Sequence, residues 1–136
     1  MEKRKTIVVI EKGEDGTYSA YPKDLKATII GEGDTASEAK KDFLNSYKEV
    51  KDFYLDTDGV IPEYLDNLDF EYTFDIPAFF NYFDFINISK FAQAIGVEPS
   101  LMRHYKSGDT TLSPKQRERI LKGIKGVASE LMEVIL

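Results

Sequence analysis

Apolar and polar positions in the first part of the chain predict a small β-sheet. Thr6–Ile10 is a β-branched run that predicts a buried strand. Glu14-Asp15-Gly16 has the glycine that a hairpin turn favours, and the alternating run Thr17–Tyr21 predicts a second strand after it. Ala27–Ile30 predicts a third strand. Because short loops join these runs, we expect an antiparallel meander.

Apolar residues at steps of three and four then predict a helix that packs on this sheet. Asp34 or Thr35 is the expected N-cap, and Glu38 stands at the capping-box spacing from Thr35. We expect the helix to fade after Tyr54. The apolar stripe consists of Ala36, Ala39, Phe43, Leu44, Tyr47, Val50 and Tyr54.

Residues 52–75 contain eight acidic residues and no basic one. Within them, Phe70, Tyr72 and Phe74 alternate with polar residues, which predicts a fourth strand with one wet, acidic face. Such a face protects a sheet edge against aggregation, or it is a docking surface for another protein; the sequence favours neither reading. The eight residues are Asp52, Asp56, Asp58, Glu63, Asp66, Asp69, Glu71 and Asp75.

A second unit is expected to begin at Asp75, as an N-cap, with Pro77 in the first helical turn. Five aromatic residues lie within residues 79–85, and no Lys or Arg is among them. Platforms for single-stranded nucleic acid interleave aromatic and basic residues. We therefore interpret the aromatic run as core of a small helical domain.

The stretch Asn87–Gly108 predicts two short helices around a glycine, the layout of a helix-turn-helix whose second helix enters the DNA major groove. Gly96 suits a turn that requires positive φ, Pro99 suits the first position of the second helix, and Gly108 suits its end. Two amphipathic helices around a glycine also occur in bundles that bind no DNA, so the polar face carries the interpretation.

No acidic residue is expected on the polar face of the second helix, where Arg103 could read guanine and Ser100 and Lys106 could hold phosphates. His104, the one histidine, is explained equally well as a DNA contact or as an exposed polar residue. The predicted DNA-contacting residues are Asn87, Lys90, Ser100, Arg103, His104, Lys106, Thr110 and Lys115.

Ser113 as N-cap and Pro114 predict the start of a last helix. Its apolar stripe is longer than a small helix-turn-helix core needs, which indicates a homodimer seam, although Gly123 and Gly126 weaken a continuous helix. The stripe consists of Ile120, Ile124, Val127, Leu131, Val134 and Ile135.

The charge of the chain divides unevenly. The 136 residues carry a net charge of −6, and they suffice for two small domains. Residues 1–76 hold 10 Lys/Arg and 18 Asp/Glu, whereas residues 77–136 hold 8 and 6. The acidic front half should repel DNA and attract a basic partner. We expect an α+β fold: a small antiparallel sheet with one helix in residues 1–75, and an all-α DNA-binding and dimerisation domain in residues 76–136.

The chain contains no cysteine, which excludes disulfides and thiolate metal sites, and we expect no cofactor. Nothing in the sequence resembles a signal peptide, and no apolar run approaches the roughly 18 residues of a membrane span. A cytoplasmic protein is the resulting expectation.

The front half resembles the HicB family of bacterial antitoxins, and Asn87–Gly108 is similar to the Cro/Xre type of helix-turn-helix. The residues that match HicB are Ile7–Ile10, Asp15–Pro22, Asp24-Leu25, Gly31–Thr35 and Glu38-Ala39. This resemblance implies a truncated RNase H-like β-β-β-α-β unit followed by a DNA-binding module.

The resemblance also implies two partners. One is a HicA-like toxin, a small basic protein that cleaves mRNA, and the other is the operator DNA of the chain's own operon, which the complex represses. An acidic front half suits a basic partner, because charge complementarity raises the association rate. The residues expected to contact the toxin are Asp56, Asp58, Glu63, Asp66, Asp69 and Glu71.

Two other functions are consistent with the sequence. The first is a stand-alone helix-turn-helix transcription regulator whose front domain senses a small ligand. The second is a nuclease, which would need carboxylates that converge on two metal ions. Its candidates are Glu11, Glu32, Asp34 and Asp42, but no acidic residue lies within the strand Ile7–Ile10, where such a site would be anchored. We therefore expect that the chain is not an enzyme.

Overall fold

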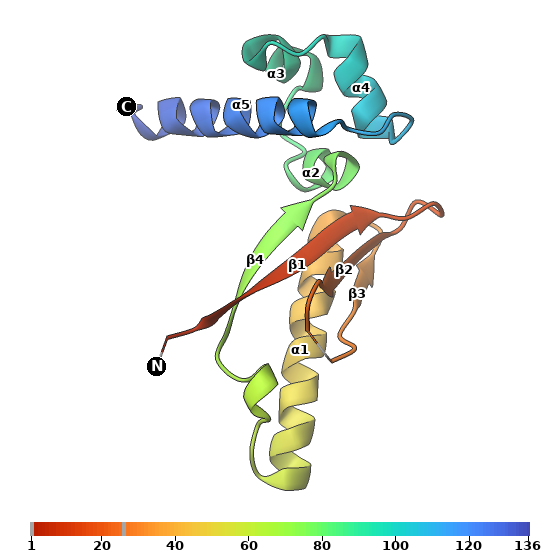
Figure 1. The fold of residues 1–136 in the computed structure, drawn as a ribbon, viewed down its shortest axis with the longest axis vertical. Helices are drawn as coiled ribbons and strands as arrows, with labels where there is room; N and C mark the ends of the chain where they lie inside the picture. Colours follow the sequence, from red (N-terminus) through yellow and green to blue (C-terminus); the bar gives the residue numbers. More distant parts are fainter. Residues whose placement is uncertain (1, 26) are drawn as a thin grey trace. The chain divides into compact units, whose positions relative to one another are not determined.

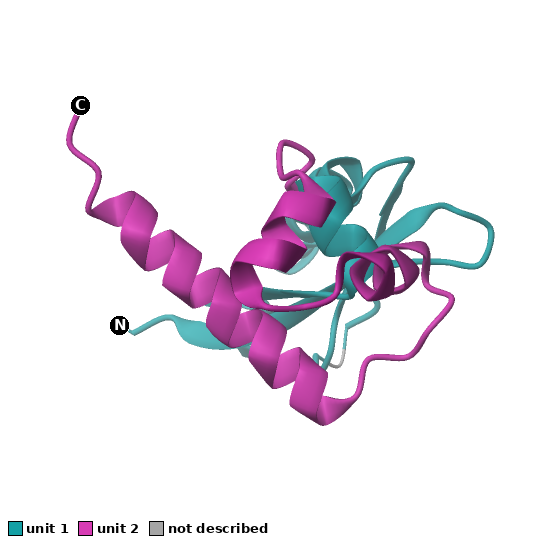
Figure 2. Cartoon of the chain, turned by 90° about the horizontal axis from the view of Figure 1, so that it is seen from above, with its two compact units in different colours: residues 1–82 teal, residues 83–136 magenta. Residues whose placement is uncertain are grey.

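The computed structural model describes residues 2–25 and 27–136, and it divides into two compact units, Met1–Tyr82 and Phe83–Leu136 (Figure 2). The described part is α+β, with a four-stranded sheet and five α-helices. The boundary between the units lies after Tyr82, later than the predicted boundary at residues 75 and 76. The difference arises because the first short helix after the sheet packs on the sheet unit.

The sheet has the strand order β3-β2-β1-β4 (Figure 1). β1 (Arg4–Lys12) pairs antiparallel with β2 (Tyr18–Pro22), and β2 pairs antiparallel with β3 (Gly31–Gly33). β4 (Leu68–Phe74) pairs parallel with β1, so the prediction of an antiparallel sheet is wrong and the sheet is mixed. A parallel neighbour needs a long crossover, usually a helix, and α1 lies in the connection that leads to β4.

The third strand is not the predicted run Ala27–Ile30. Ile29 is buried, but the hydrogen-bonded strand is Gly31–Gly33. A Cβ added to Gly31 would lie 2.2 Å from the backbone nitrogen of Phe43 and 2.4 Å from the carbonyl oxygen of Ala39. The strand lies so close to α1 that only glycine fits, and strand propensity alone misplaces it.

The helix α1 (Ala36–Asp58) begins as predicted: Thr35 Oγ1 accepts the backbone N–H of Glu38 at 3.1 Å. The Glu38 carboxylate turns back to accept the N–H of Asp34 at 2.8 Å. The helix continues past Tyr54 and ends at Gly59, where φ is 72°. Leu44, placed on the buried stripe by the sequence, is 39% exposed instead.

The core of the first unit lies between α1 and one face of the sheet. Phe43 and Tyr47 approach the ring of Phe70 edge-on, with centroids 5.1 and 5.0 Å apart. The Tyr47 hydroxyl donates to the carbonyl of Leu65 in the 3-10 turn η1 (Glu63–Leu65). The buried members are Val8, Ile10, Tyr18, Ala20, Ile29, Ala36, Ala39, Phe43, Tyr47, Leu65 and Ala78.

The short helix α2 (Ile76–Tyr82) belongs to this first unit. Asp75 caps it as predicted, since its Oδ1 accepts the N–H of Ala78 at 2.8 Å. Asn81 Oδ1 accepts the N–H of Ala36 at 2.7 Å, and Lys40 Nζ donates to the Tyr82 hydroxyl at 3.1 Å. The aromatic run was interpreted as core of the second domain, but its α2 part packs on the sheet unit.

The second unit contains α3 (Ile88–Ile95), α4 (Pro99–Ser107) and α5 (Pro114–Met132). The helix α5 is continuous through Gly123 and Gly126. A Cβ on Gly123 would lie 2.5 Å from both Cβ and Cγ2 of Ile95, whereas one on Gly126 would meet nothing within 4 Å. Gly123 therefore allows α5 to approach α3, whereas no neighbouring residue requires a glycine at position 126.

These two glycines give a matched pair of substitutions. Gly126→Ala should stabilise the protein by about 0.5–1 kcal/mol, because alanine has the higher helix propensity. Gly123→Ala gains the same propensity but forces α5 away from Ile95, and it should lower the free energy of unfolding. Urea denaturation of both variants measures the difference; equal stabilisation by the two would contradict the close contact.

Candidate functional site

The helices α3 and α4 are joined by a turn of residues 96–98 and are capped at all four ends. Asn87 Oδ1 accepts the N–H of Lys90 at 3.0 Å, and Gly96 ends α3 with φ 77°. Glu98 caps α4, Pro99 occupies its first turn, and Gly108 ends it with φ 84°. The positive φ values predicted for the two glycines are thereby confirmed.

The buried residues of α3 and α4 hold the pair together from one side. The N–H of Val97 donates to the carbonyl of Ala92 at 2.9 Å, so the turn folds back on the end of α3. Because one face of α4 is buried against these neighbours, its opposite face is presented to solvent. The buried apolar residues of this unit are Phe91, Ala92, Val97, Met102, Tyr105 and Ile120.

The polar residues predicted on α4 are all exposed on this opposite face: Ser100, Arg103, His104 and Lys106. Arg103 Nη1 donates to Ser89 Oγ on α3 at 3.0 Å. This bond crosses the two helices and reduces the freedom of the guanidinium at the surface. The face thus carries two cations, one of which is held in place.

Two carboxylates border this face, which the sequence interpretation described as free of acidic residues. Glu98 accepts the hydroxyl of Ser100 and the N–H of Leu101. Asp109 Oδ2 lies 3.2 Å from His104 Nδ1, an ion pair whenever the imidazole is protonated. Glu98 lies in the turn before α4, and Asp109 directly follows Gly108 at its other end, so helical periodicity does not reveal either carboxylate.

These contacts stabilise the charged forms of both carboxylates. Hydrogen bonds from the Ser100 hydroxyl and the Leu101 N–H lower the pKa of Glu98 below its ordinary value. Hydrogen bonds from Ser107 and then His104 lower the pKa of Asp109. Both groups are therefore negatively charged at neutral pH, and Ser100 and His104 each face an anion within the chain.

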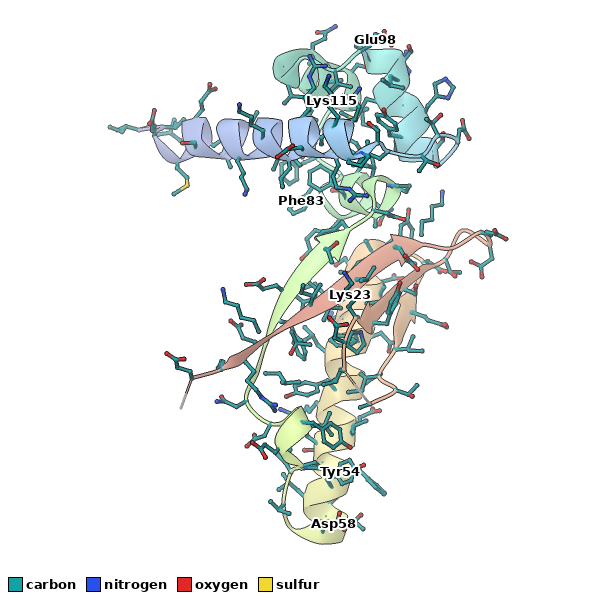
Figure 3. All side chains as sticks on the ribbon, in the orientation of Figure 1. Lys23, Tyr54, Asp58, Phe83, Glu98 and Lys115 are labelled. Carbon is teal, nitrogen blue, oxygen red and sulfur yellow. The ribbon has the colours of Figure 1, made fainter. Side chains whose placement is uncertain are left out.

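The remaining predicted contact residues surround α4. Asn87 is the α3 cap, Lys90 lies exposed in the first turn of α3, and Thr110 lies exposed in the loop after α4. Lys115 lies in the first turn of α5 (Figure 3). It lines a shallow groove with Gln116, Glu118, Arg119 and Lys122.

The sequence interpretation missed the basic character of α5. A Cβ on Gly96 would lie 3.4 Å from Arg119 Nη2, so this guanidinium lies beside the turn between α3 and α4. The periodicity of apolar residues in α5 predicts which side chains pack, but it does not indicate which charged side chains lie beside a neighbouring turn. Its basic residues are Lys115, Arg117, Arg119, Lys122 and Lys125.

The predicted dimer stripe divides into an inner and an outer part. Ile120 is buried inside its own unit and is therefore unsuited to a seam; Ile124 and Val127 are half-buried. Leu131 is 66% exposed and Ile135 94% exposed, and Val134 is exposed as well. Only the end of the stripe is free for a second copy, because α3 packs against its beginning. The helix was predicted to continue through Val134 and Ile135, but α5 ends at Met132, so these two residues lie beyond it.

The six predicted toxin-contacting residues are all exposed, but they form two groups. Asp56 and Asp58 lie at the end of α1, near Glu63 of η1 in sequence, and Asp66 follows η1 (Figures 1 and 3). The Arg4 guanidinium binds the carbonyl oxygens of Glu63 and Asp66. The second group, Asp69 and Glu71, lies on β4.

Two of the four carboxylates considered for a nuclease, Glu11 and Asp42, have other contacts. Glu11 accepts the Tyr21 hydroxyl at 3.2 Å, and Asp42 accepts the backbone N–H of Glu32 at 2.9 Å. Within residues 2–25 and 27–136, no group of three or more acidic or histidine side chains could hold a metal ion. In the same described ranges, no helix is long and apolar enough to cross a membrane.

Comparison of the chain with protein-family models, with curated proteins and with solved structures found no match in any of the three.

The Glu98 cap makes a prediction about pH. Asparagine is a preferred N-cap that does not titrate, so Glu98→Asn should keep α4 capped at every pH. Since the folded pKa of Glu98 is lowered, its stabilisation is complete above the unfolded pKa and is lost as the pH falls through the folded value.

Between pH of about 5 and about 3, the wild type should therefore lose more stability than Glu98→Asn. Urea denaturation at several pH values measures this, and the other carboxylates cancel because both proteins carry them. Identical pH dependence of the two proteins would show that the carboxylate contributes nothing as a cap.

Proposed function

We propose that the second unit is a Cro/Xre-like helix-turn-helix that binds double-stranded operator DNA through the exposed face of α4. The observation that carries the proposal is the presentation of Arg103 and Lys106 on a helix held to α3 by the turn 96–98. A recognition helix is held to its partner in this way and places its exposed side chains at base edges and phosphates.

The charge distribution supports DNA binding by this unit. It carries 8 Lys/Arg and 6 Asp/Glu, against 10 and 18 in the first unit. Lys90 and Lys115 flank α4 in the chain, and Arg119 lies beside the α3–α4 turn. Contacts of this kind to phosphates fix the register of a protein on DNA, and contacts to bases give its specificity.

We further propose that the whole chain is a HicB-type antitoxin. In this proposal the first unit, a truncated RNase H-like module, binds and neutralises a HicA-like mRNA-cleaving toxin, and the chain acts in the cytoplasm as an autorepressor without enzymatic activity. Support comes from the net charge of −8 in the first unit and from its β-β-β-α-β element order. The HicB-like segments Asp15–Pro22 and Gly31–Thr35 contain β2 and β3 of that sheet.

Operator binding is proposed to require a homodimer. A helix-turn-helix dimer reads two half-sites about 34 Å apart, and the exposed residues Leu131, Val134 and Ile135 are the proposed contact with the second copy. A single unit with two fewer acidic than basic residues would hold DNA weakly at physiological salt.

Substitutions in α4 test the DNA-binding proposal. Arg103→Ala should lower affinity for the operator upstream of the chain's own gene by about tenfold or more. Lys106→Ala should weaken binding to all sequences and reduce the slope of log K against log salt by about 0.9. Lys48→Ala, an exposed lysine on α1, is the matched control.

Fluorescence anisotropy at several salt concentrations provides both quantities. Unchanged operator affinity in Arg103→Ala and Lys106→Ala would exclude α4 as the recognition helix.

Co-expression tests the antitoxin proposal. A short neighbouring gene that encodes a small basic protein should arrest growth alone and be harmless when this chain is co-expressed, and the two proteins should co-purify. Growth arrest that this chain does not relieve would exclude the antitoxin function. Retained operator binding together with a response to a small metabolite would instead support a stand-alone regulator.

A further inference from the structure

One face of the four-stranded sheet has no helix of its own unit packed against it. The buried residues Val8 and Ile10 of β1 point to α1, so Ile7 and Val9 point to the opposite face. The pairing register places Glu71 beside Ile7, and Tyr21 and Thr73 on either side of Val9. In the first unit, α1 lies on one side of the sheet only (Figure 1).

The sequence of β1 is that of a strand covered on both faces. Ile7-Val8-Val9-Ile10 is apolar without alternation, which is typical of parallel strands between two layers. β1 indeed has a parallel neighbour in β4. Yet Ile7 is 41% exposed, and an apolar strand centre is therefore left in contact with water.

The surroundings of this apolar centre are mainly acidic. Asp69 and Glu71 of β4 share the face, as do Glu11 of β1 and, by register with Ser19, Glu32 of β3. Among the described residues that the register places here, two lysines share this face with the four carboxylates. Lys5 Nζ lies 3.1 Å from Glu71 Oε1, and Lys23 lies opposite Ile7, since its backbone N–H donates to the Ile7 carbonyl at 2.9 Å. Ile7 and Val9 thus lie in a field of net negative charge.

We propose that this face is a docking surface for a basic amphipathic helix of a second protein. The apolar stripe of such a helix would cover Ile7 and Val9, as a second layer covers the sheet of an α/β protein, and its Lys or Arg side chains would pair with Asp69, Glu71 and Glu11. A second copy of the same face is a poor occupant, because its carboxylates would lie against these carboxylates.

This inference rests on the proposed function, in which the acidic unit binds a basic protein. It restricts the predicted toxin contact to one face of the sheet. Asp69 and Glu71 belong to the docking face. Asp56, Asp58 and Glu63, at the end of α1 and in η1, do not.

Two synthetic helical peptides of about 18 residues, roughly 27 Å long, test the docking face without toxin or DNA. One carries a leucine stripe flanked by lysines, and the other carries glutamate in place of each lysine. Each is titrated into the full-length ¹⁵N-labelled chain. The lysine peptide should bind and shift the amide resonances of Ile7, Val9, Tyr21 and Thr73, and the glutamate peptide should not bind.

Charge and apolar variants give matched comparisons. Ile7→Lys and Glu71→Lys should each lower the affinity of the chain for the lysine peptide by about tenfold. Leu44→Lys replaces an apolar residue of nearly the same exposure on α1, and Asp56→Lys makes the same kind of charge change at the end of α1; both should bind as the wild type does. Circular dichroism and urea denaturation check that each variant is folded.

Three results would overturn the docking face: no binding of the lysine peptide, equal binding of the glutamate peptide, or resonance shifts confined to residues 52–66. Its failure is distinguishable from that of the proposed function. If the Ile7→Lys and Glu71→Lys variants still neutralise the toxin, the docking face is overturned and the antitoxin function is not. Peptide binding at the face with no toxin neutralised overturns the antitoxin function alone.

Discussion

The close contact between β3 and α1 is the constraint on which the first unit depends. Gly31 leaves no room for a side chain against the backbone of residues 39 and 43, so the glycine strand lies directly on the helix. That contact fixes the edge of the sheet and brings the buried side of α1 over β2 and β1. The same helix lies in the connection that brings β4 parallel to β1 and concentrates the core on one side. The uncovered opposite face is a direct consequence of this arrangement.

Features governed by neighbouring residues could be predicted from the sequence. The caps at Thr35 and Asp75 and the left-handed turns at Gly96 and Gly108 each depend on a few adjacent residues, and all are present. The third strand was misplaced because β-branched residues favour strands in general, while Gly31 satisfies a contact with a helix later in the chain. The parallel pairing of β4 and the attachment of α2 to the first unit are likewise determined by segments distant in the sequence. Local patterns of apolar and polar residues do not predict such contacts.

The candidate site shows the same division. The four exposed polar residues of α4 follow from helical periodicity, and the structure places them on one face. Glu98 and Asp109 were missed because they lie in turns, yet they hold Ser100 and His104. In the proposed complex with DNA, these anions oppose binding to arbitrary phosphates and leave specific contacts to supply the affinity. Ionised carboxylates can also accept a hydrogen bond from the N4 amino group of cytosine, so in that proposed complex they would contribute to sequence preference as well as to repulsion.

The contact between Gly123 and Ile95 has a geometric consequence for the proposed dimer. Because α5 lies directly against α3, its exposed end is rigidly connected to the helix pair that presents α4. The position of the seam between two copies would then determine the distance and the rotation between the two recognition helices. A shift of the Leu131 contact by one residue along α5 would turn one copy by about 100° about the helix axis. The spacing of the operator half-sites would in that case depend on the last turn of α5 and the residues that follow it, far from any residue proposed to contact a base.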